Sequence, residues 1–429
     1  MNAPDFSVDI DQNEFLPSGA REVNAIVTVK SEGSVGGHES PESAAEIIIV
    51  DCSGSMADPI TKLIQAREAT AVAIDAIRDG VAFAVIAGTQ DATPFFPANE
   101  SLTVASAASR DAAKRELRRL RASGGTAIGQ WLHLARRTFE TREDGLRHAI
   151  LLTDGRNEHE SAGDLAAAIE QCEGVFRCDC RGVGTDWKVD ELRKISTALL
   201  GTVDIVPEPA GLAADFEAMM RESMAKQVAD VALQVWTPKH ATIRFVKQVF
   251  PTVDDLTARR AQVDPQKGNY PTGAWGAGES RDYHVCIDVQ PGAVGQVMLA
   301  ARLSLVYTTP DGPQTLGQGP VRAVWTDDEA LSSRISRGVA TYTGQAELAQ
   351  AIQEGLEARD KGDIATAEAQ LSRAVALAHQ SGNTDLAGLL DNVVEVDPAS
   401  GVARLKDKVA DADAMKLDTH STKTVRVRK

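Results

Sequence analysis

Apolar residues follow two different spacings along this chain of 429 residues. Between residues 43 and 227, short apolar runs such as Ile47-Ile48-Ile49-Val50 alternate with segments whose apolar positions fall on one helical face. Continuous apolar runs are typical of strands buried on both faces of a parallel sheet. The alternation predicts a doubly wound α/β sheet with helices on both faces. We expect further strands at 81–87, 148–153, 175–183 and 202–206, and helices after Pro59 and at 105–122, 128–140 and 212–227.

The flanking regions, residues 1–42 and 228–325, alternate with a period of two instead. Turn signals such as Pro291-Gly292 separate their strands, a pattern typical of an antiparallel β-sandwich. Because two strands alone are marginally stable in water, the N-terminal strands need partners from elsewhere in the chain. We therefore expect them to complete the sandwich, so that the α/β domain is an insertion within it. The composition of residues 31–44 is that of a linker. The alternating positions are Phe6, Val8 and Ile10, then 23–29, 231–235, 283–289 and 297–307.

Residues 326–418 return to helical spacing. Small and apolar residues between Gly355 and Ala374 match one tetratricopeptide repeat in part. A single repeat cannot bury its own face. The favoured interpretation is a helical hairpin packed on further helices at 385–393 and 403–417, and the alternative is a small groove for a partner peptide. Residues 419–429 are basic and hydroxyl-rich, and we expect a disordered tail.

Composition narrows the possible partners. Lys and Arg number 45 against 61 Asp and Glu, for a net charge of −16, which disfavours nucleic acid and anionic membranes. No basic-then-apolar leader and no membrane-length apolar run occurs, so we expect a cytoplasmic protein. The five cysteines lack zinc-site spacing and fit a reducing compartment. Cys178 and Cys180 alternate on one face of a strand, which favours packing.

Oxygen-bearing side chains gather at the ends of the predicted strands. Asp51, Ser53 and Ser55 form a D-x-S-x-S motif after the first buried strand, Thr126 lies in a G-G-T stretch, and Asp154 follows another strand in T-D-G. Open α/β sheets bind ligands at the carboxyl ends of their strands. Hard oxygen donors suit Mg²⁺, Mn²⁺ or Ca²⁺ rather than zinc. Taken alone, the D-x-S-x-S motif is equally compatible with a strand-end turn in which Asp51 and Ser53 cap the next helix.

The order D-x-S-x-S, G-G-T, T-D-G resembles the von Willebrand factor type A (VWA) domain with its metal-ion-dependent adhesion site. The resemblance covers residues 43–227 and favours the bacterial intracellular kind that carries a companion β-domain, since the stretch 272–279 is similar to a segment of those proteins. It implies that Ser53, Ser55 and Thr126 bind the metal directly and that Asp51 and Asp154 bind it directly or through water. It also implies an open metal position for an Asp or Glu of a partner protein. Trp275, within the stretch 272–279, is either a recognition residue or a core anchor.

Two functions follow from this resemblance. The first is a metal-dependent protein-interaction module that acts as a scaffold or regulator of an intracellular complex. The second is a VWA subunit that works with a separate ATPase, chelatase-like or MoxR-like, in complex remodelling or metal insertion. The chain itself has no G-x-x-x-x-G-K-[ST] phosphate loop. A metallohydrolase is disfavoured because no general acid and base are paired near the motif, and His159 is interpreted as a solvated loop residue. We expect no enzyme activity.

The basic tail suggests one further hypothesis. Thr422 and Thr424 stand beside basic residues. Phosphate on threonine adds charge and acceptor oxygens that arginine clusters recognise. We therefore expect phosphorylation at one of them, read by a phosphothreonine-binding protein.

Overall fold

The chain folds into two units, and each is described by itself. The structure, a computed structural model, describes residues 5–32, 43–142, 145–309, 312–334, 336–397 and 402–426. One unit is formed by residues 38–229. The other is formed by residues 1–37 together with residues 230–429. Most of the expected linker, residues 33–42, lies outside the described residues.

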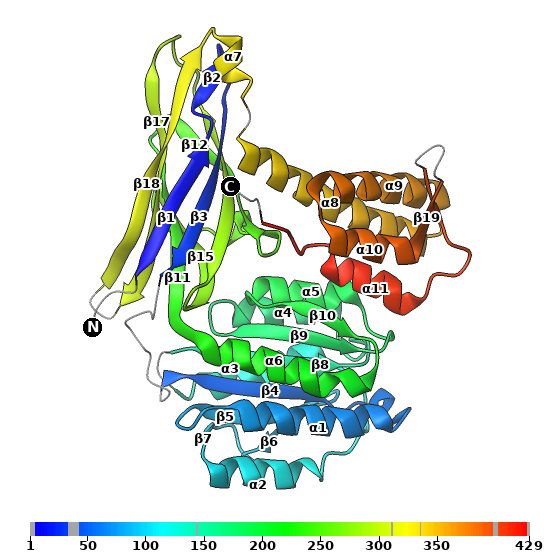
Figure 1. The fold of residues 1–429 in the computed structure, drawn as a ribbon. Helices are drawn as coiled ribbons and strands as arrows, with labels where there is room; N and C mark the ends of the chain where they lie inside the picture. The colour runs from blue at the N-terminus through cyan, green and yellow to red at the C-terminus, as the bar shows by residue number, and fades with distance from the viewer. Residues whose placement is uncertain are drawn as a thin grey trace. The chain divides into compact units, whose positions relative to one another are not determined.

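Among the described residues, a seven-stranded sheet lies at the centre of the unit 38–229 (Figure 1). Its order is β10-β9-β8-β4-β5-β6, and β7 pairs with β5. The strands from β10 to β5 run parallel, while β6 and β7 are antiparallel to β5. Every residue of β4 is buried, as its apolar run predicts. The strands are β4 (Ala45–Asp51), β5 (Ala82–Gly88), β6 (Ala92–Phe96), β7 (Thr103–Val104), β8 (Arg147–Thr153), β9 (Arg177–Val183) and β10 (Val203–Val206).

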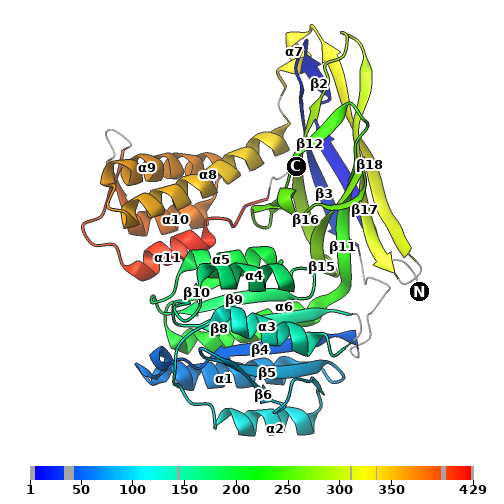
Figure 2. The same ribbon diagram turned by 180° about the vertical axis from the view of Figure 1, so that it is seen from behind.

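Helices cover both faces of this sheet (Figures 1 and 2). Helices α1, α2 and α6 pack on the face that presents Ile48 and Val50. Helices α3, α4 and α5 lie on the opposite face, in front of the sheet in Figure 2. The predicted doubly wound arrangement is confirmed. The helices are α1 (Thr61–Ala76), α2 (Ala107–Leu117), α3 (Ile128–Phe139), α4 (Ala162–Cys172), α5 (Val189–Ala198) and α6 (Leu212–Ala225), with 3₁₀ helices η2 (Gly54–Ala57) and η3 (Pro209–Gly211).

Two local predictions in this unit need correction. The helix expected at 105–122 begins at Ala107, because Ser106 and Ser109 cap it reciprocally, and it ends at Leu117. The edge strands β6 and β7 were not expected. Pro94 within β6 is tolerated because this strand lies at the edge of the sheet, where a missing N–H donor costs little.

The cysteines act as packing residues. All five are free and buried. The Sγ atoms of Cys178 and Cys180 lie 4.0 Å apart on one face of β9, as the alternation predicts. Cys52 packs in the core beside Met56, and burial raises the pKa of its thiol to about 12. Cys52 is therefore protonated at neutral pH and does not offer a thiolate ligand.

The second unit contains a β-sandwich of two largely antiparallel sheets. One sheet has the order β1-β3-β16-β12-β13, and the other has the order β14-β15-β11-β17-β18-β2. Strand β3 precedes the α/β unit in sequence and pairs with β16, which follows it. This pairing confirms that the α/β domain is inserted in the sandwich. The strands are β1 (Phe6–Gln12), β2 (Phe15–Pro17), β3 (Glu22–Ser31), β11 (Lys226–Trp236), β12 (Ala241–Phe250), β13 (Asp254–Asp255), β14 (Ala261–Asp264), β15 (Lys267–Gly276), β16 (Ser280–Val289), β17 (Val297–Thr309) and β18 (Gly312–Thr326), with the 3₁₀ helix η4 (Thr257–Arg259).

Trp275 is a core anchor of the sandwich. Its side chain is fully buried, and its indole N–H donates to Thr272 Oγ1 at 3.0 Å. Phe6 meets the ring edge-on with centroids 5.4 Å apart, and the guanidinium of Arg281 lies 4.1 Å from the ring centroid. A residue enclosed on these sides cannot contact a partner, so the packing interpretation holds.

A helical region follows the sandwich in the same unit. Helices α8 (Arg337–Asp360) and α9 (Ile364–Ser381) form a hairpin after the short helix α7 (Glu329–Ser332). Helices α10 (Thr384–Val393) and α11 (Asp411–His420) complete its core, which includes Leu348, Leu371 and Leu417. The hairpin thus packs on neighbouring helices, which is the favoured of the two expectations.

The helix expected at 403–417 is only partly correct. Residues Ala403–Leu405 form strand β20, which pairs with β19 (Val394–Val396), and the helix begins at Asp411. The amide of Ala403 also donates to Ser372 Oγ on α9 at 2.9 Å. Cross-strand partners in β19 and the hydroxyl of Ser372 therefore satisfy this backbone, and the hydroxyl is available only where α9 lies beside the segment.

The expectation of a disordered tail is wrong for the residues that the structure describes. Thr424 donates its amide to Pro251 O at 2.9 Å and its hydroxyl to Val249 O at 2.8 Å. Val425 and Gln345 exchange two hydrogen bonds of 2.7 and 2.8 Å. The tail is ordered because it satisfies backbone groups at the end of β12 and the side chain of Gln345. Residues 427–429 lie outside the described part.

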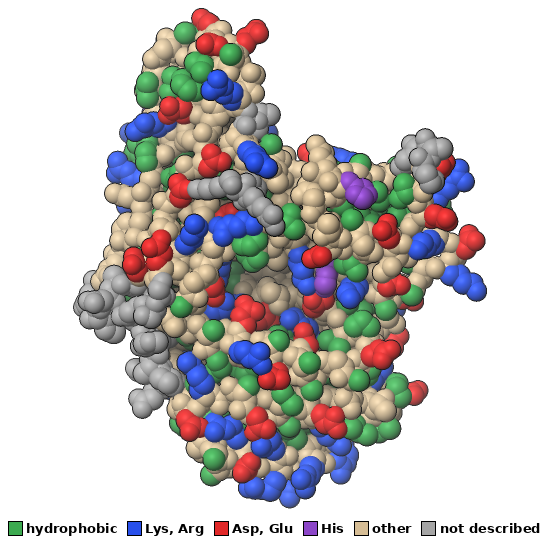
Figure 3. Space-filling model, in the orientation of Figure 1, with side chains coloured by type: hydrophobic (Ala, Val, Ile, Leu, Met, Phe, Trp, Pro, Cys, Tyr) green, Lys and Arg blue, Asp and Glu red, His purple; other side chains and the backbone are tan. Residues whose placement is uncertain are grey.

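Charged side chains of both signs are mixed on the surface. On the face drawn in Figure 3, Lys and Arg lie among Asp and Glu over most of the surface, and Lys and Arg side chains gather at its lower edge. Within the part of the chain that the structure covers, every helix is too short or too polar for a membrane span.

Candidate metal centre

Asp51 is held at the carboxyl end of β4 by two donors. Strands β4 and β8 are parallel neighbours, so Asp51 and Thr153 lie side by side at the same edge of the sheet. Thr153 Oγ1 donates to Asp51 Oδ2 at 2.5 Å, and the amide of Ser53 donates to Asp51 Oδ1 at 2.7 Å. Burial raises the pKa of Asp51 to about 6, although the hydrogen bonds from Ser53 and Thr153 oppose the increase. A cation nearby would favour the ionised carboxylate.

The two serines of the motif connect Asp51 to the loop after β8. Ser53 precedes η2, and its Oγ lies 3.0 Å from Ser55 Oγ. Ser55 Oγ donates to Asp154 Oδ1 at 2.6 Å. The structure therefore brings four of the five predicted residues into one continuous hydrogen-bonded cluster at the end of β4 and β8.

Thr126 reaches the same cluster from the loop before α3. The amide of Gly54 donates to Gly124 O at 2.9 Å, and the amide of Ser123 donates to Cys52 O at 2.8 Å, so the two loops are joined through their backbones. A β-carbon added at Gly155 would lie 3.3 Å from Ser55 Oγ and 3.5 Å from Thr126 Oγ1. Both hydroxyls therefore border the space that the missing side chain of Gly155 leaves free.

The loop after β8 fixes the position of Thr126. The amide of Thr126 donates to His159 Nδ1 at 3.1 Å, and the amide of His159 donates to Thr126 O at 2.9 Å. Asn157 and Glu160 accept hydrogen bonds from the first amides of α3, Ile128 N at 2.8 Å and Gly129 N at 2.6 Å. His159 is exposed, as expected for a loop residue, and it also positions the loop that carries Thr126.

Lys62 supplies a positive charge that the sequence motifs do not predict. It lies in the first turn of α1, and its Nζ is 2.7 Å from Asp154 Oδ2. The Lys62 side chain is 10% exposed and that of Asp154 is 0% exposed, so this is a buried ion pair. A second carboxylate, Asp186, lies 3.8 Å from the same Nζ and is 76% exposed. A lysine near a helix start is ordinarily solvated, so nothing in the sequence distinguishes Lys62.

The donor set fits a hard cation. Three hydroxyls and two carboxylates converge, and all of the donor atoms are oxygens of the type that Mg²⁺, Mn²⁺ and Ca²⁺ prefer. Within the described residues, His, Cys, Asp and Glu side chains alone form no group of three that could hold a metal. The serine and threonine hydroxyls are therefore needed to complete a coordination sphere.

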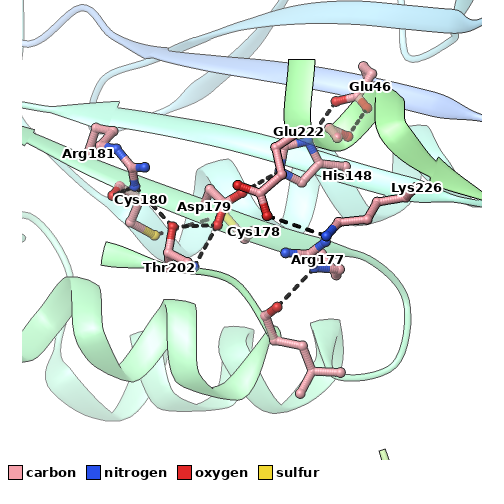
Figure 4. Close-up of polar contacts among 12 residues, drawn as sticks. Glu46, His148, Arg177, Cys178, Asp179, Cys180, Arg181, Thr202, Glu222 and Lys226 are labelled. Carbon is pink, nitrogen blue, oxygen red and sulfur yellow. Dashed lines mark hydrogen bonds and ion pairs between the residues drawn. The ribbon is translucent and has the colours of Figure 1, made fainter. Parts of the chain in front are cut away.

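A second buried polar cluster lies at the opposite end of the same strands (Figure 4). His148 on β8 contacts Glu46 Oε2 on β4 at 2.7 Å and Asp179 Oδ2 on β9 at 2.8 Å. Burial alone would lower the pKa of His148, but the two carboxylates raise it to about 9. Glu46 also accepts a hydrogen bond from Ser223 on α6, so the cluster ties the last helix of the unit to the sheet.

Thr422 and Thr424 belong to the other unit. The Thr424 hydroxyl donates to a carbonyl of β12, and its side chain is half-buried. Phosphate on Thr424 would require this hydrogen bond to break, because the hydroxyl proton that it uses would be lost. The carbonyl of Thr422 accepts from Val253 N at 2.8 Å.

A largely parallel α/β sheet with helices on both faces defines the class of Rossmann-like domains to which VWA domains belong. A family model described as von Willebrand factor type A domain matches residues 45–205. A second, described as von Willebrand factor type A C-terminal domain, matches residues 376–421. A solved structure of a von Willebrand factor type A protein from Catenulispora acidiphila is 53% identical with a TM-score of 0.95, and the match covers 99% of this chain and 98% of that one. The chain belongs to the von Willebrand factor type A family.

Two further matches are more distant. The ArnB paralog VWA2 from Sulfolobus acidocaldarius is 12% identical with a TM-score of 0.59, and the match covers 97% of this chain and 98% of that one. At this identity the likeness concerns the fold alone. An uncharacterized protein from Synechocystis sp. is 26% identical over 263 residues, which are 58% of this chain and 58% of that protein.

Proposed function

We propose that the VWA domain binds a partner protein by holding a divalent cation, Mg²⁺ or alternatively Mn²⁺ or Ca²⁺, that accepts an Asp or Glu of the partner. The observation that supports this most directly is the convergence of Ser53, Ser55 and Thr126 around the space beside Gly155. When bound, such an ion supplies a Lewis-acidic position for a carboxylate oxygen. The neutral hydroxyls leave that position electron-poor, which favours an anionic ligand.

The hydrogen bonds of the two carboxylates favour binding over hydrolysis. Both oxygens of Asp51 accept hydrogen bonds, from Ser53 and Thr153. Both oxygens of Asp154 are also engaged, by Ser55 and Lys62. A carboxylate acting as a general base must be free to approach the proton that it removes. We therefore propose an interaction module, a scaffold or regulator of an intracellular complex, rather than an enzyme.

Metal-dependent capture with matched variants tests this proposal. Full-length protein is used as bait in native lysate, with Mg²⁺ or with EDTA, as the parent, Asp51→Ala, Thr126→Ala and Thr93→Ala. Thr93 is an exposed threonine of β6 and serves as the control. We expect a partner that is retained by the parent and Thr93→Ala in Mg²⁺, and lost in EDTA and in the other two variants. Equal retention by Thr126→Ala and the parent would contradict the proposal.

The identity of the captured partner separates the two expected roles. A separate ring ATPase among the captured proteins would favour the chelatase-like or MoxR-like alternative. A metal-dependent partner without ATPase activity would favour the scaffold. Purified partner fragments with Asp→Asn or Glu→Gln changes then test whether an acidic side chain carries the contact, because the amides keep the shape and remove the charge.

A further inference from the structure

We infer that Lys62 sets the net charge of the metal centre and thereby makes cation binding and carboxylate binding mutually dependent. This inference rests on the proposed function of the site. It assigns a role to a residue outside the D-x-S-x-S, G-G-T and T-D-G motifs. The observation that supports it is the contact between the Lys62 ammonium and Asp154 Oδ2, whose atoms lie 2.7 Å apart.

The position of Lys62 is fixed by its surroundings. Its backbone amide donates to Pro59 O at 2.9 Å, in the turn between the D-x-S-x-S loop and α1. Its side chain reaches Asp154 with little exposure to solvent, whereas its other acidic neighbour, Asp186, is largely exposed. Because water screens the exposed carboxylate, Asp154 is the principal partner of the ammonium.

This ion pair divides the oxygens of Asp154 between two tasks. Oδ2 is occupied by Lys62, and Oδ1 accepts from Ser55, one of the predicted metal ligands. Asp154 thus orients a hydroxyl of the site while its own charge is matched by a lysine of the same chain. Asp51 is the other carboxylate of the site. Its described hydrogen bonds come from Ser53 and Thr153, which are both neutral.

The formal charges of the site residues determine the net charge of the site with a cation bound. Asp51, Asp154 and Lys62 together carry a single negative charge, so a bound divalent cation gives the site a single positive charge. Without the ammonium, the two carboxylates would neutralise the cation fully. A site with residual positive charge attracts a carboxylate, and it also binds the cation less tightly than a neutralising site would.

Lys62 therefore weakens cation binding when no partner carboxylate is present. It also increases the gain in cation affinity that a partner carboxylate produces. A carboxylate that enters the site removes the residual charge and so increases affinity for the cation. By linkage, the cation increases affinity for the carboxylate by the same factor. The pair of ligands then binds together more readily than either alone.

The test measures Mn²⁺ binding to the full-length protein by electron paramagnetic resonance. Titrations are made in sodium chloride and in sodium acetate at equal ionic strength, with a correction for Mn²⁺ bound by acetate itself. The variants are Lys62→Met and Lys62→Gln, which remove the charge, Lys62→Arg, which keeps it, and Lys188→Met, whose side chain is 57% exposed. Circular dichroism melting selects the charge-removing variant that retains the parental transition.

We expect acetate to lower the Mn²⁺ dissociation constant of the parent at least threefold. In Lys62→Met or Lys62→Gln, we expect the Mn²⁺ dissociation constant in chloride to be at least tenfold lower than in the parent. Acetate should then no longer change that constant. Lys62→Arg and Lys188→Met keep the parental pattern. If the parent binds Mn²⁺ and both charge-removing variants bind it with the parental affinity and acetate response, the role of Lys62 is wrong while the metal site stands. If no variant binds Mn²⁺ at millimolar concentration, the proposed function fails together with this inference.

Discussion

At the scale of single residues, the α/β unit places two buried polar clusters at opposite ends of the same strands. One surrounds Asp51 and carries the candidate metal site. The other surrounds His148, which lies between two carboxylates. Both clusters depend on adjacent parallel strands, since parallel pairing brings the starts of β4, β8 and β9 together at one edge and the ends of β4 and β8 together at the other.

The His148 cluster makes stability depend on pH. The pKa of His148 rises from 6.5 in the unfolded chain to about 9 in the folded protein. A raised folded-state pKa contributes stability that is complete below about pH 6.5 and is lost as the pH rises through about 9. We expect the free energy of unfolding to fall by roughly 2–3 kcal/mol over this range. Urea denaturation of the parent and of His148→Gln checks this, because the variant should lose that part of the pH dependence.

The control for this measurement is His379→Gln, which removes an exposed histidine of α9. Its stability should follow the parental pH profile. An unchanged profile in His148→Gln would show that the histidine is not charged in the folded protein.

Gly155 provides a residue-scale test of the metal site that leaves every proposed ligand in place. Alanine at 155 would bring a methyl group within 3.3 Å of Ser55 Oγ and 3.5 Å of Thr126 Oγ1. We expect Gly155→Ala to weaken Mn²⁺ binding at least tenfold with little change in melting temperature, because the methyl group fills the space between the hydroxyls. Gly163→Ala in α4 is the control, since the added carbon has only Ser161 Oγ nearby at 3.6 Å. Parental Mn²⁺ affinity in Gly155→Ala would place the cation elsewhere.

At the scale of elements, the contact between α8 and α9 depends on a glycine. A β-carbon at Gly355 would lie 2.8 Å from Leu371 Cγ, which is closer than real side chains approach. The same helix offers a matched position, Gly344, where an added β-carbon meets nothing within 4 Å. One helix therefore contains a glycine required by packing and a glycine that packing does not require.

These two glycines give opposite predictions. We expect Gly355→Ala to destabilise the helical region by about 1–3 kcal/mol through overpacking. Gly344→Ala should stabilise it by up to about 1 kcal/mol, because alanine favours the helix. Denaturation followed by far-ultraviolet circular dichroism measures both changes. Equal stabilisation by the two substitutions would mean that α9 does not pack against Gly355.

At the scale of the whole chain, residues distant in sequence meet within the sandwich unit. Asp282 on β16 is buried and accepts hydrogen bonds from Tyr342 on α8 and from Arg426 of the tail, the latter at 3.1 Å. Arg426 also lies 5.1 Å from the Phe250 ring centroid. One buried carboxylate therefore holds a strand, a helix and the end of the described chain together.

Loss of the arginine should release the tail. In Arg426→Met, Asp282 loses a charged partner, and we expect a cost of about 1–3 kcal/mol after allowance for the partial exposure of the arginine. Hydrogen exchange at the amides of Thr424 and Val425 should accelerate at least tenfold. Lys423→Met, which changes an exposed neighbour, should leave exchange at both amides unchanged. Unaltered exchange in Arg426→Met would show that the backbone contacts alone hold the tail.

Much of the fold followed from local patterns. Buried apolar runs predicted the parallel strands, and period-two alternation predicted that the N-terminal strands join the sandwich. The exceptions have physical causes. Edge strand β6 contains a proline, the segment 403–405 pairs with β19 and takes a further partner from helix α9, and the tail satisfies carbonyls far earlier in the chain. Each exception depends on partners that the segment itself does not contain.

The sequence by itself determined where the candidate metal ligands lie along the chain. An Asp and two Ser follow one buried strand, a Thr precedes a helix, and an Asp follows a second strand. These residues could be found because each lies within a few positions of a recognisable strand end. Only the tertiary structure decided which charged residues pair, at this site and elsewhere in the chain. Lys62 and Asp154 are 92 residues apart, Glu46 and His148 are 102 apart, and Asp282 and Arg426 are 144 apart. Such pairs form when sheet register and helix packing bring them together, and no local periodicity encodes that separation.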